Sequence, residues 1–247
     1  MIRLFAPAKL TWYLEVTGVR EDGYHLLSSE MLSVGLVDQL VLDEDADYLR
    51  VVGSGVAPLD ESNLIRRALA LVGRRAGVTL DKQIPVGGGL GGGSSDAGAI
   101  LRWAGGVSPE KALELGGDVP FCQVGGCALV EGVGEYVTPL PFVEREVTLF
   151  LPDFEVSTAQ VYSAYDELRA RGERSQGRNH LEAPARRVQA RLATLLDWAR
   201  AEFGDVQLAG SGSTVFVEGH VFATPSGDVA SPAGTVKWCQ TIATPRA

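Results

Sequence analysis

The chain has 247 residues and a formal net charge of −9, and 45% of its residues are hydrophobic. This length and apolar content suffice for a buried core and exclude an intrinsically disordered chain. The negative charge disfavours nucleic acid and anionic membranes as partners, since both select a basic surface. No signal peptide is recognised, and no apolar run approaches the roughly 18 residues of a membrane helix, so a soluble, cytoplasmic protein is expected.

Strands and helices are both predicted in the first 150 residues. Runs of β-favouring residues predict strands over 2–16, 32–42, 48–52, 78–86, 128–130 and 147–151. Apolar residues at helical spacing predict a helix that begins after Ser62 or Asn63 and ends before Gly77. Two shorter helices are predicted over 97–103 and 109–115. Because these elements lack the regular alternation of a doubly wound sheet, an α+β fold is predicted.

The rest of the chain is predicted to form a second α+β unit. Its expected elements are a helix capped by Ser157, a helix over 185–203, short strands around 210–213 and a strand over 235–242. The Gly-, Pro- and Ser-rich segment 219–234 indicates a loop. We therefore expect two domains, 1–150 and 151–247.

The most informative motif is a glycine-rich run between a predicted strand and a predicted helix. Six of the ten residues from Gly87 to Asp96 are glycine, although glycine is about 0.5–1 kcal/mol less favourable than alanine in regular structure. A loop that precedes a helix in this way can direct free N–H groups at one phosphate. A flexible linker is the alternative, but Ser-Ser-Asp and an Ala-rich helix follow the run directly.

Two other phosphate-binding motifs fit this run poorly. A Walker A loop ends in Gly-Lys-Ser/Thr, and no lysine lies at that place. The spacing Gly87-x-Gly89-x-x-Gly92 matches a dinucleotide fingerprint, but any glycine-dense run does so. The βαβ unit that such a fingerprint requires is also not predicted, which argues against a dinucleotide site.

Two further segments leave a structural and a functional interpretation open. Ser94, Ser95 and Asp96 can cap the following helix. Alternatively, Ser95 or Asp96 can face Mg²⁺, which prefers hard oxygen ligands. The turn from Gly210 to Ser213 can present N–H groups to substrate phosphates, or it can be an ordinary tight turn.

The glycine run and its neighbours resemble the ATP loop of the GHMP kinases. Within this superfamily they are most similar to the kinases of 4-diphosphocytidyl-2-C-methyl-D-erythritol, and five other segments agree in the same order. These are Ala6-Pro7-Ala8-Lys9-Leu10 with Arg20-Glu21-Asp22-Gly23-Tyr24-His25, Asn63-Leu64-Ile65, Gly117-Asp118-Val119-Pro120-Phe121, Asn179-His180-Leu181-Glu182 and Gly210-Ser211-Gly212-Ser213. The resemblance spans nearly the whole chain.

The resemblance implies a two-domain GHMP kinase fold with the active site in the cleft between the domains. It also implies phosphorylation of the 2-hydroxyl of the cytidine-diphosphate-linked methylerythritol, with ATP and Mg²⁺, in non-mevalonate isoprenoid biosynthesis. Asp118 corresponds to the catalytic base and Lys9 to its partner. Thr11, Tyr24 and His25 correspond to substrate-binding positions, and Tyr24 and His25 are expected to hold the cytosine by stacking and hydrogen bonding. The implied ATP-binding residues are Pro85, Val86, Gly87, Gly88, Gly89, Leu90, Gly91, Gly92, Gly93, Ser94 and Ser95.

Three residues depart from the family pattern. Thr11 replaces the usual asparagine, so one amide donor near the substrate is lost. Met31 stands where an aromatic residue is common, and His180 replaces the usual aspartate.

Two alternative functions differ from this interpretation. A GHMP kinase that acts on homoserine or mevalonate is disfavoured by the Tyr24-His25 pair. A non-catalytic nucleotide-binding regulator is disfavoured because Lys9 and Asp118 are both present.

Overall fold

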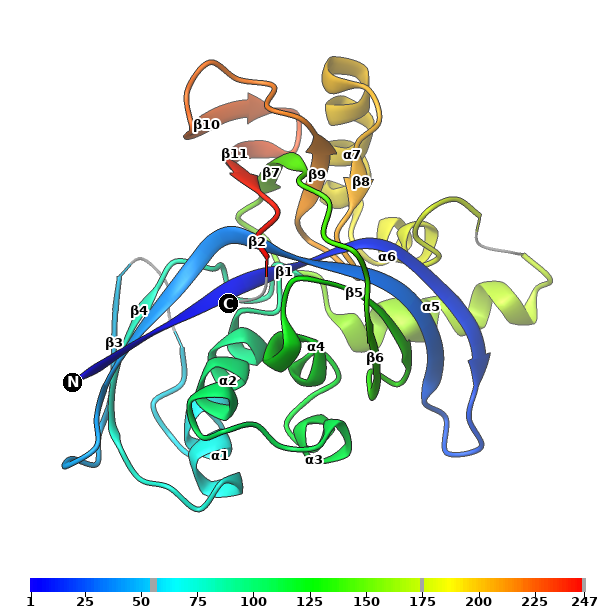
Figure 1. The fold of residues 1–247 in the computed structure, drawn as a ribbon. Coiled ribbons are helices and arrows are strands. Elements are labelled where there is room, and N and C mark those ends of the chain that lie inside the picture. Colours follow the sequence, from blue (N-terminus) through cyan, green and yellow to red (C-terminus); the bar gives the residue numbers. More distant parts are fainter. Residues whose placement is uncertain (54–56, 174–175, 246–247) are drawn as a thin grey trace.

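Two β-sheets and the helices that cover them form the protein (Figure 1). The computed structural model describes residues 1–53, 57–173 and 176–245. The elements are β1 (Ile2–Val19), β2 (His25–Asp43), β3 (Leu49–Gly53), α1 (Leu64–Leu71), β4 (Gly77–Lys82), α2 (Gly92–Trp103), α3 (Pro109–Leu113), α4 (Val119–Val124), β5 (Cys127–Gly132), β6 (Tyr136–Pro139), β7 (Glu146–Leu151), α5 (Thr158–Ala170), α6 (Glu182–Val188), α7 (Ala190–Phe203), β8 (Gln207–Leu208), β9 (Val215–Glu218), β10 (Ser226–Ser231) and β11 (Gly234–Ile242). The predicted α+β class is confirmed.

The first sheet is built around the long antiparallel hairpin of β1 and β2. The hairpin runs from the Ile2↔Leu42 pair to the Val19↔His25 pair. On the other edge of β2, β4 pairs with residues 39–43 and β5 pairs with residues 27–32. The stretch of β2 between these two partners contacts other segments, since the Ser33 N–H donates to the Gly126 carbonyl at 2.7 Å and Val34 forms an isolated bridge with Ala243. The glycine run lies against β1, where the Lys9 N–H donates to the Leu90 carbonyl.

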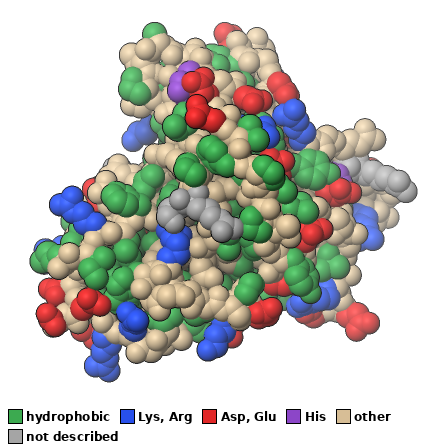
Figure 2. All heavy atoms as spheres, viewed as in Figure 1, with side chains coloured by type: hydrophobic (Ala, Val, Ile, Leu, Met, Phe, Trp, Pro, Cys, Tyr) green, Lys and Arg blue, Asp and Glu red, His purple; other side chains and the backbone are tan. Residues whose placement is uncertain are grey.

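The second sheet has the strand order β10-β11-β7-β9-β8, and all its pairs are antiparallel. Strand β7 pairs with β9 and β11 in this sheet and spans the predicted boundary near residue 150, so the exact division into domains stays a prediction. Within the described residues, no helix is long and apolar enough to cross a membrane. On the face drawn in Figure 2, basic side chains are dispersed among acidic and apolar ones.

Three main apolar clusters hold the layers together. One packs α1 and α2 against the first sheet and contains Ile65, Leu80 and Ile100. A second packs α5 to α7 against the second sheet. The third joins the two sheets and contains Leu10, Leu149 and Phe216. Since burial of one large apolar side chain contributes roughly 1.5–3 kcal/mol, this third cluster stabilises the relative placement of the two sheets.

The structure corrects several predicted elements. The expected helix over 185–203 is two helices, because the backbone of Gln189 is extended (φ −131°, ψ 103°). The expected loop over 219–234 contains β10, an exposed edge strand without an apolar pattern that forms by pairing with β11. The short elements α4 and β6 were not predicted.

Candidate active site

Helix α2 begins inside the glycine run, at Gly92, and not at residue 97 as predicted. Its N-cap residue is Gly91, which has a left-handed φ of 64° and offers no side-chain cap. Of the two interpretations left open for Ser94, Ser95 and Asp96, the structure does not support capping of this helix. The first N–H groups of the helix have no carbonyl one turn earlier, so they are free to bind an anion.

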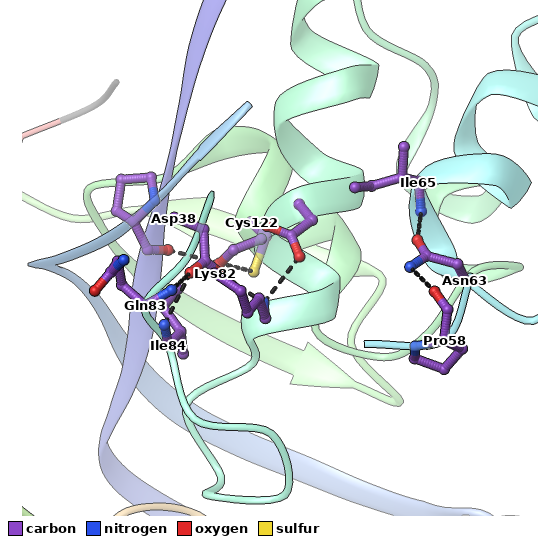
Figure 3. A network of polar contacts seen from close by, with 11 residues as sticks. Asp38, Pro58, Asn63, Ile65, Lys82, Gln83, Ile84 and Cys122 are labelled. Carbon is purple, nitrogen blue, oxygen red and sulfur yellow. Dashed lines mark hydrogen bonds and ion pairs between the residues drawn. The ribbon is translucent and has the colours of Figure 1, made fainter. Parts of the chain in front are cut away.

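A cavity of about 350 Å³ lies beside the glycine loop. Its walls include the glycine residues, the apolar side chains of Leu64 and Val86, and the polar residues Asn63, Lys82 and Asp96. Asn63 is held in place by two bonds (Figure 3): Nδ2 donates to the Pro58 carbonyl at 2.6 Å and Oδ1 accepts from the Ile65 N–H at 2.8 Å. Apolar walls beside free N–H groups suit a nucleotide, whose base is flat and whose phosphates are anionic.

Most of the predicted ATP-binding residues line this cavity, namely Pro85, Val86, Gly87, Gly88, Gly89, Gly91, Gly92, Gly93 and Ser94. Two of them do not. The Leu90 side chain is fully buried in the cluster that joins the sheets. Ser95 is also buried, and its hydroxyl donates to the Pro7 carbonyl at 2.6 Å. Both side chains therefore anchor the loop to the protein interior and do not face the cavity.

Lys9 and Asp118 form an ion pair, with 3.1 Å between Nζ and Oδ2. Lys9 lies on β1, where its N–H donates to the Leu90 carbonyl at 3.0 Å, and its ammonium also donates to Thr11 Oγ1 at 3.2 Å. Asp118 precedes α4 as its N-cap residue, but its side chain does not cap the helix. The carboxylate is therefore available to a ligand, and 31% of the side chain is exposed.

A second cavity, of about 780 Å³, contains Asp118 in its wall. Ser94 borders this cavity and the nucleotide cavity, so the two meet at the first turn of α2. Met31 also lines the larger cavity, whereas Thr11 is buried beneath Lys9. A ligand in the larger cavity can therefore contact both Asp118 and Ser94 at the start of α2.

Aromatic and acidic side chains of α5 surround His25 at the far end of the larger cavity. The His25 ring lies against Tyr162, with 4.6 Å between ring centroids, and its Nε2 lies 2.8 Å from Asp166 Oδ1. Tyr24 lines the same cavity but is 63% exposed, with the Arg20 guanidinium 5.4 Å from its ring centroid. The structure thus brings Tyr24 and His25 together at one cavity.

Sequence reasoning missed Tyr162 and Asp166, and it also missed Lys82. Burial, and then the charge of Asp118, raise the pKa of Tyr162, which therefore stays a neutral phenol. Helical spacing could have placed Tyr162 on the inner face of α5. It could not have shown the contact with His25, because Asp166 and His25 are 141 residues apart.

The Asn179 motif and the Gly210–Ser213 turn form one unit. Asn179 Nδ2 donates to the Gly210 carbonyl at 2.7 Å, and the Thr214 N–H donates to the Gly88 carbonyl at 3.1 Å. The turn is thereby tied to the glycine loop across the junction of the two sheets. Whether its N–H groups also bind substrate phosphates stays a prediction.

Comparison with known proteins shows the family. The GHMP kinases N terminal domain matches residues 63–126. A 4-diphosphocytidyl-2-C-methyl-D-erythritol kinase of Nitrosomonas eutropha is 37% identical over 239 residues, which cover 86% of each chain. The chain belongs to this kinase family. The family member of Paracoccus denitrificans is likewise 37% identical, over 85% of this chain and 84% of its own.

Solved structures support the assignment of the chain to this family. A crystal structure of 4-(cytidine 5'-diphospho)-2C-methyl-D-erythritol kinase has a TM-score of 0.73 and 33% identity, covering 98% of this chain and 100% of its own. The L. major mevalonate kinase, solved in complex with R-mevalonate, has a TM-score of 0.62 at 12% identity over 99% of this chain and 96% of its own, and so shows the fold alone. The predicted GHMP kinase fold is confirmed, and ATP is the co-substrate that such a kinase implies.

Proposed function

We propose that the chain transfers the γ-phosphoryl group of ATP to the 2-hydroxyl of 4-diphosphocytidyl-2-C-methyl-D-erythritol, a step of non-mevalonate isoprenoid biosynthesis. The observation that carries this proposal is the position of the Lys9–Asp118 pair. Asp118 lines the larger cavity, and both members of the pair lie against Gly91, which lines the nucleotide cavity. The relatives named above support the choice of the alcohol.

Asp118 is proposed to accept the proton of the attacking hydroxyl. Its exposed carboxylate borders the larger cavity, and Lys9 holds it in one orientation. A carboxylate is a weak base for an alcohol, but phosphoryl transfer has a loose transition state that requires little activation of the nucleophile. Orientation of the hydroxyl and neutralisation of developing charge by the Lys9 ammonium therefore account for most of the expected catalysis.

The glycine loop is proposed to bind the ATP phosphates through the N–H groups at the start of α2. A Mg²⁺ ion that accompanies ATP would offset the negative charge of the phosphates. Throughout the described part of the chain, no group of three or more His, Cys, Asp or Glu side chains is placed to hold a metal ion. Of the two predicted ligands, Ser95 is bonded to Pro7, whereas Asp96 Oδ1 is buried at the cavity wall without a protein partner there. Asp96 therefore fits this role better.

The cytosine of the acceptor is proposed to bind between Tyr24 and the His25–Tyr162 pair. Stacked rings fit the face of a pyrimidine, and a ring nitrogen of His25 can form a hydrogen bond with its edge. This arrangement favours a cytidylyl alcohol over homoserine or mevalonate, neither of which has a base to stack. We further propose that the protein is cytoplasmic and acts on a small molecule, without nucleic acid or a membrane as partner.

An assay with three alcohols tests the proposed function. Purified protein, ATP and Mg²⁺ are incubated separately with 4-diphosphocytidyl-2-C-methyl-D-erythritol, homoserine and mevalonate, and ADP is measured. We expect ADP with the cytidylyl alcohol alone. ADP with homoserine only would overturn the substrate, and ATP binding without ADP from any alcohol would indicate a regulator.

A further inference from the structure

Asp38, on β2, holds the segment that leads from β4 into the glycine loop (Figure 3). The ladder between β2 and β4 ends at the Gln39↔Asp81 pair. Beyond this pair, the N–H groups of Gln83 and Ile84 donate to Asp38 Oδ1 at 2.5 and 2.8 Å. Asp38 is fully buried, so water cannot replace these bonds if the carboxylate is moved.

The other oxygen of the same carboxylate binds a buried lysine. Asp38 Oδ2 lies 2.5 Å from Lys82 Nζ, and this ammonium also lies 2.9 Å from Asp96 Oδ2 on α2. All three side chains are buried. Removing one partner of such a group leaves an uncompensated charge in a low-dielectric environment, so the arrangement is strongly held. Lys82 therefore ties strand β2 to helix α2.

Lys82 also lies against the start of α2. A Cβ atom on Gly92, the first residue of the helix, would be 2.7 Å from Lys82 Nζ. Lys82 and Asp96 border the nucleotide cavity, whereas Asp38 does not line either cavity of the proposed active site. Asp38 can therefore influence a bound nucleotide only through the residues that it holds.

We infer that Asp38 is a positioning residue of the ATP site, which fixes the entry of the glycine loop and the Lys82 ammonium beneath the first turn of α2. The inference rests on the proposed kinase function. It assigns Asp38 to the binding of the nucleotide and not to the binding of the alcohol, since the network does not reach the cavity around His25. Loss of the Asp38 charge should release Lys82 and make the glycine loop more mobile, without altering the larger cavity around His25.

Asp38→Asn tests this inference, with Asp81→Asn as the matched control. Asparagine keeps an oxygen for the two N–H groups but loses the charge that holds Lys82. Asp81 lies at the end of the same ladder and accepts a bond from the Gln83 side chain. Since a hydrogen bond to a charged group is strong, we expect Asp38→Asn to raise the KM for ATP about tenfold. Its kcat and its KM for the alcohol should change by less than about twofold, and Asp81→Asn should leave all three parameters unchanged.

Two measurements on the full chain separate positioning from general destabilisation. The affinity for a non-hydrolysable ATP analogue, measured by calorimetry, should fall in Asp38→Asn by the same factor as the KM rises. Amide hydrogen exchange should become faster over 83–96 in that variant and not in the control. Unchanged analogue affinity, or an equal rise in the KM for the alcohol, would overturn the inference. The analogue measurement does not depend on which alcohol is phosphorylated, so it stands apart from the test of the proposed function.

A second variant covers the case in which Asp38→Asn does not fold. Asp96→Asn keeps the Asp38–Lys82 pair and the bonds to Gln83 and Ile84, and removes only the charge on α2. The affinity is measured without Mg²⁺, so that the proposed role of Asp96 as a metal ligand does not contribute. We expect about a threefold loss of analogue affinity, since one of the two carboxylates around Lys82 remains. Wild-type affinity in this variant would show that Lys82 does not orient the start of α2.

Discussion

The two lysine–aspartate pairs beside the start of α2 have nearly equal lengths but very different surroundings. Lys9 and Asp118 are 3.1 Å apart, and Asp118 is 31% exposed towards the larger cavity. Lys82 and Asp96 are 2.9 Å apart, and neither side chain is more than 4% exposed. An exposed carboxylate can accept a bond from an incoming hydroxyl, whereas a buried pair is held in one arrangement. The difference separates a reacting pair from a positioning pair.

Adjacent glycines allow both lysines to approach the helix. A Cβ atom on Gly91 would lie 2.8 Å from Lys9 Cγ, and one on Gly92 would lie 2.7 Å from Lys82 Nζ. The glycine run therefore provides room for two ammonium groups as well as for phosphates. Each pair can be altered separately, which makes the comparison testable.

The largest effect is expected from Asp118→Asn, which removes the proposed base and keeps the shape of the side chain. We expect kcat to fall by about 10²–10⁴, with the KM for ATP little changed, since loss of a general base affects the chemical step. Steady-state kinetics with the cytidylyl alcohol measure both parameters. A variant that retains most of its activity would remove Asp118 from the mechanism.

Lys9→Met should have the next largest effect. Methionine fills similar space but leaves Asp118 and Thr11 without their shared donor. We expect kcat to fall by about 10², a size typical of losing one group that stabilises developing charge. If only the KM for ATP rose, Lys9 would bind phosphate and would not act on the reacting groups.

Gly91→Ala tests the space between the reacting pair and the helix, with Gly73→Ala as its control. Both glycines have a left-handed φ, 64° and 65°, but nothing lies within 4 Å of a Cβ at Gly73. Both changes should cost about 1–2 kcal/mol of stability from backbone strain. The kinetic effect should differ: Gly91→Ala is expected to raise the KM for ATP about tenfold, because the loop must move away from Lys9. Equal kinetics in the two variants would contradict a role for close approach.

The smallest effect concerns the pH dependence of the buried pair. Burial raises the pKa of Asp96 from 3.8 to about 7, although the charge of Lys82 opposes the shift. The unfolded chain therefore loses this proton at lower pH than the folded protein does. The favourable contribution of the protonated group to the free energy of unfolding is complete below pH 3.8 and is lost as the pH rises through about 7.

Asp96→Asn should remove this dependence, because an amide does not ionise. Relative to the wild type, the variant should gain stability between about pH 4 and pH 8. Urea unfolding without nucleotide or Mg²⁺ measures the difference at each pH. A difference that does not vary with pH would show that Asp96 has an ordinary pKa.

Helix caps depend only on residues that are close in the sequence, and the sequence predicted two of them correctly. Asn63 caps α1 by accepting from the Ile65 N–H, and Ser157 caps α5 by accepting from the Gln160 N–H, as expected. Local rules failed where pairing or a single extended residue decides the structure. The edge strand β10 has no apolar pattern of its own, and Gln189 divides an otherwise continuous helical pattern.

The sequence by itself determined the family, the phosphate-binding character of the glycine run and the identity of Lys9 and Asp118 as candidates. These follow from residue types at short spacings and from the order of motifs along the chain. Only the tertiary structure decided which lysine–aspartate pair is exposed and which is buried. Asp38 and Lys82 are 44 residues apart, and His25 and Asp166 are 141 apart. Such contacts arise from the packing of whole sheets and helices, and no local pattern specifies them.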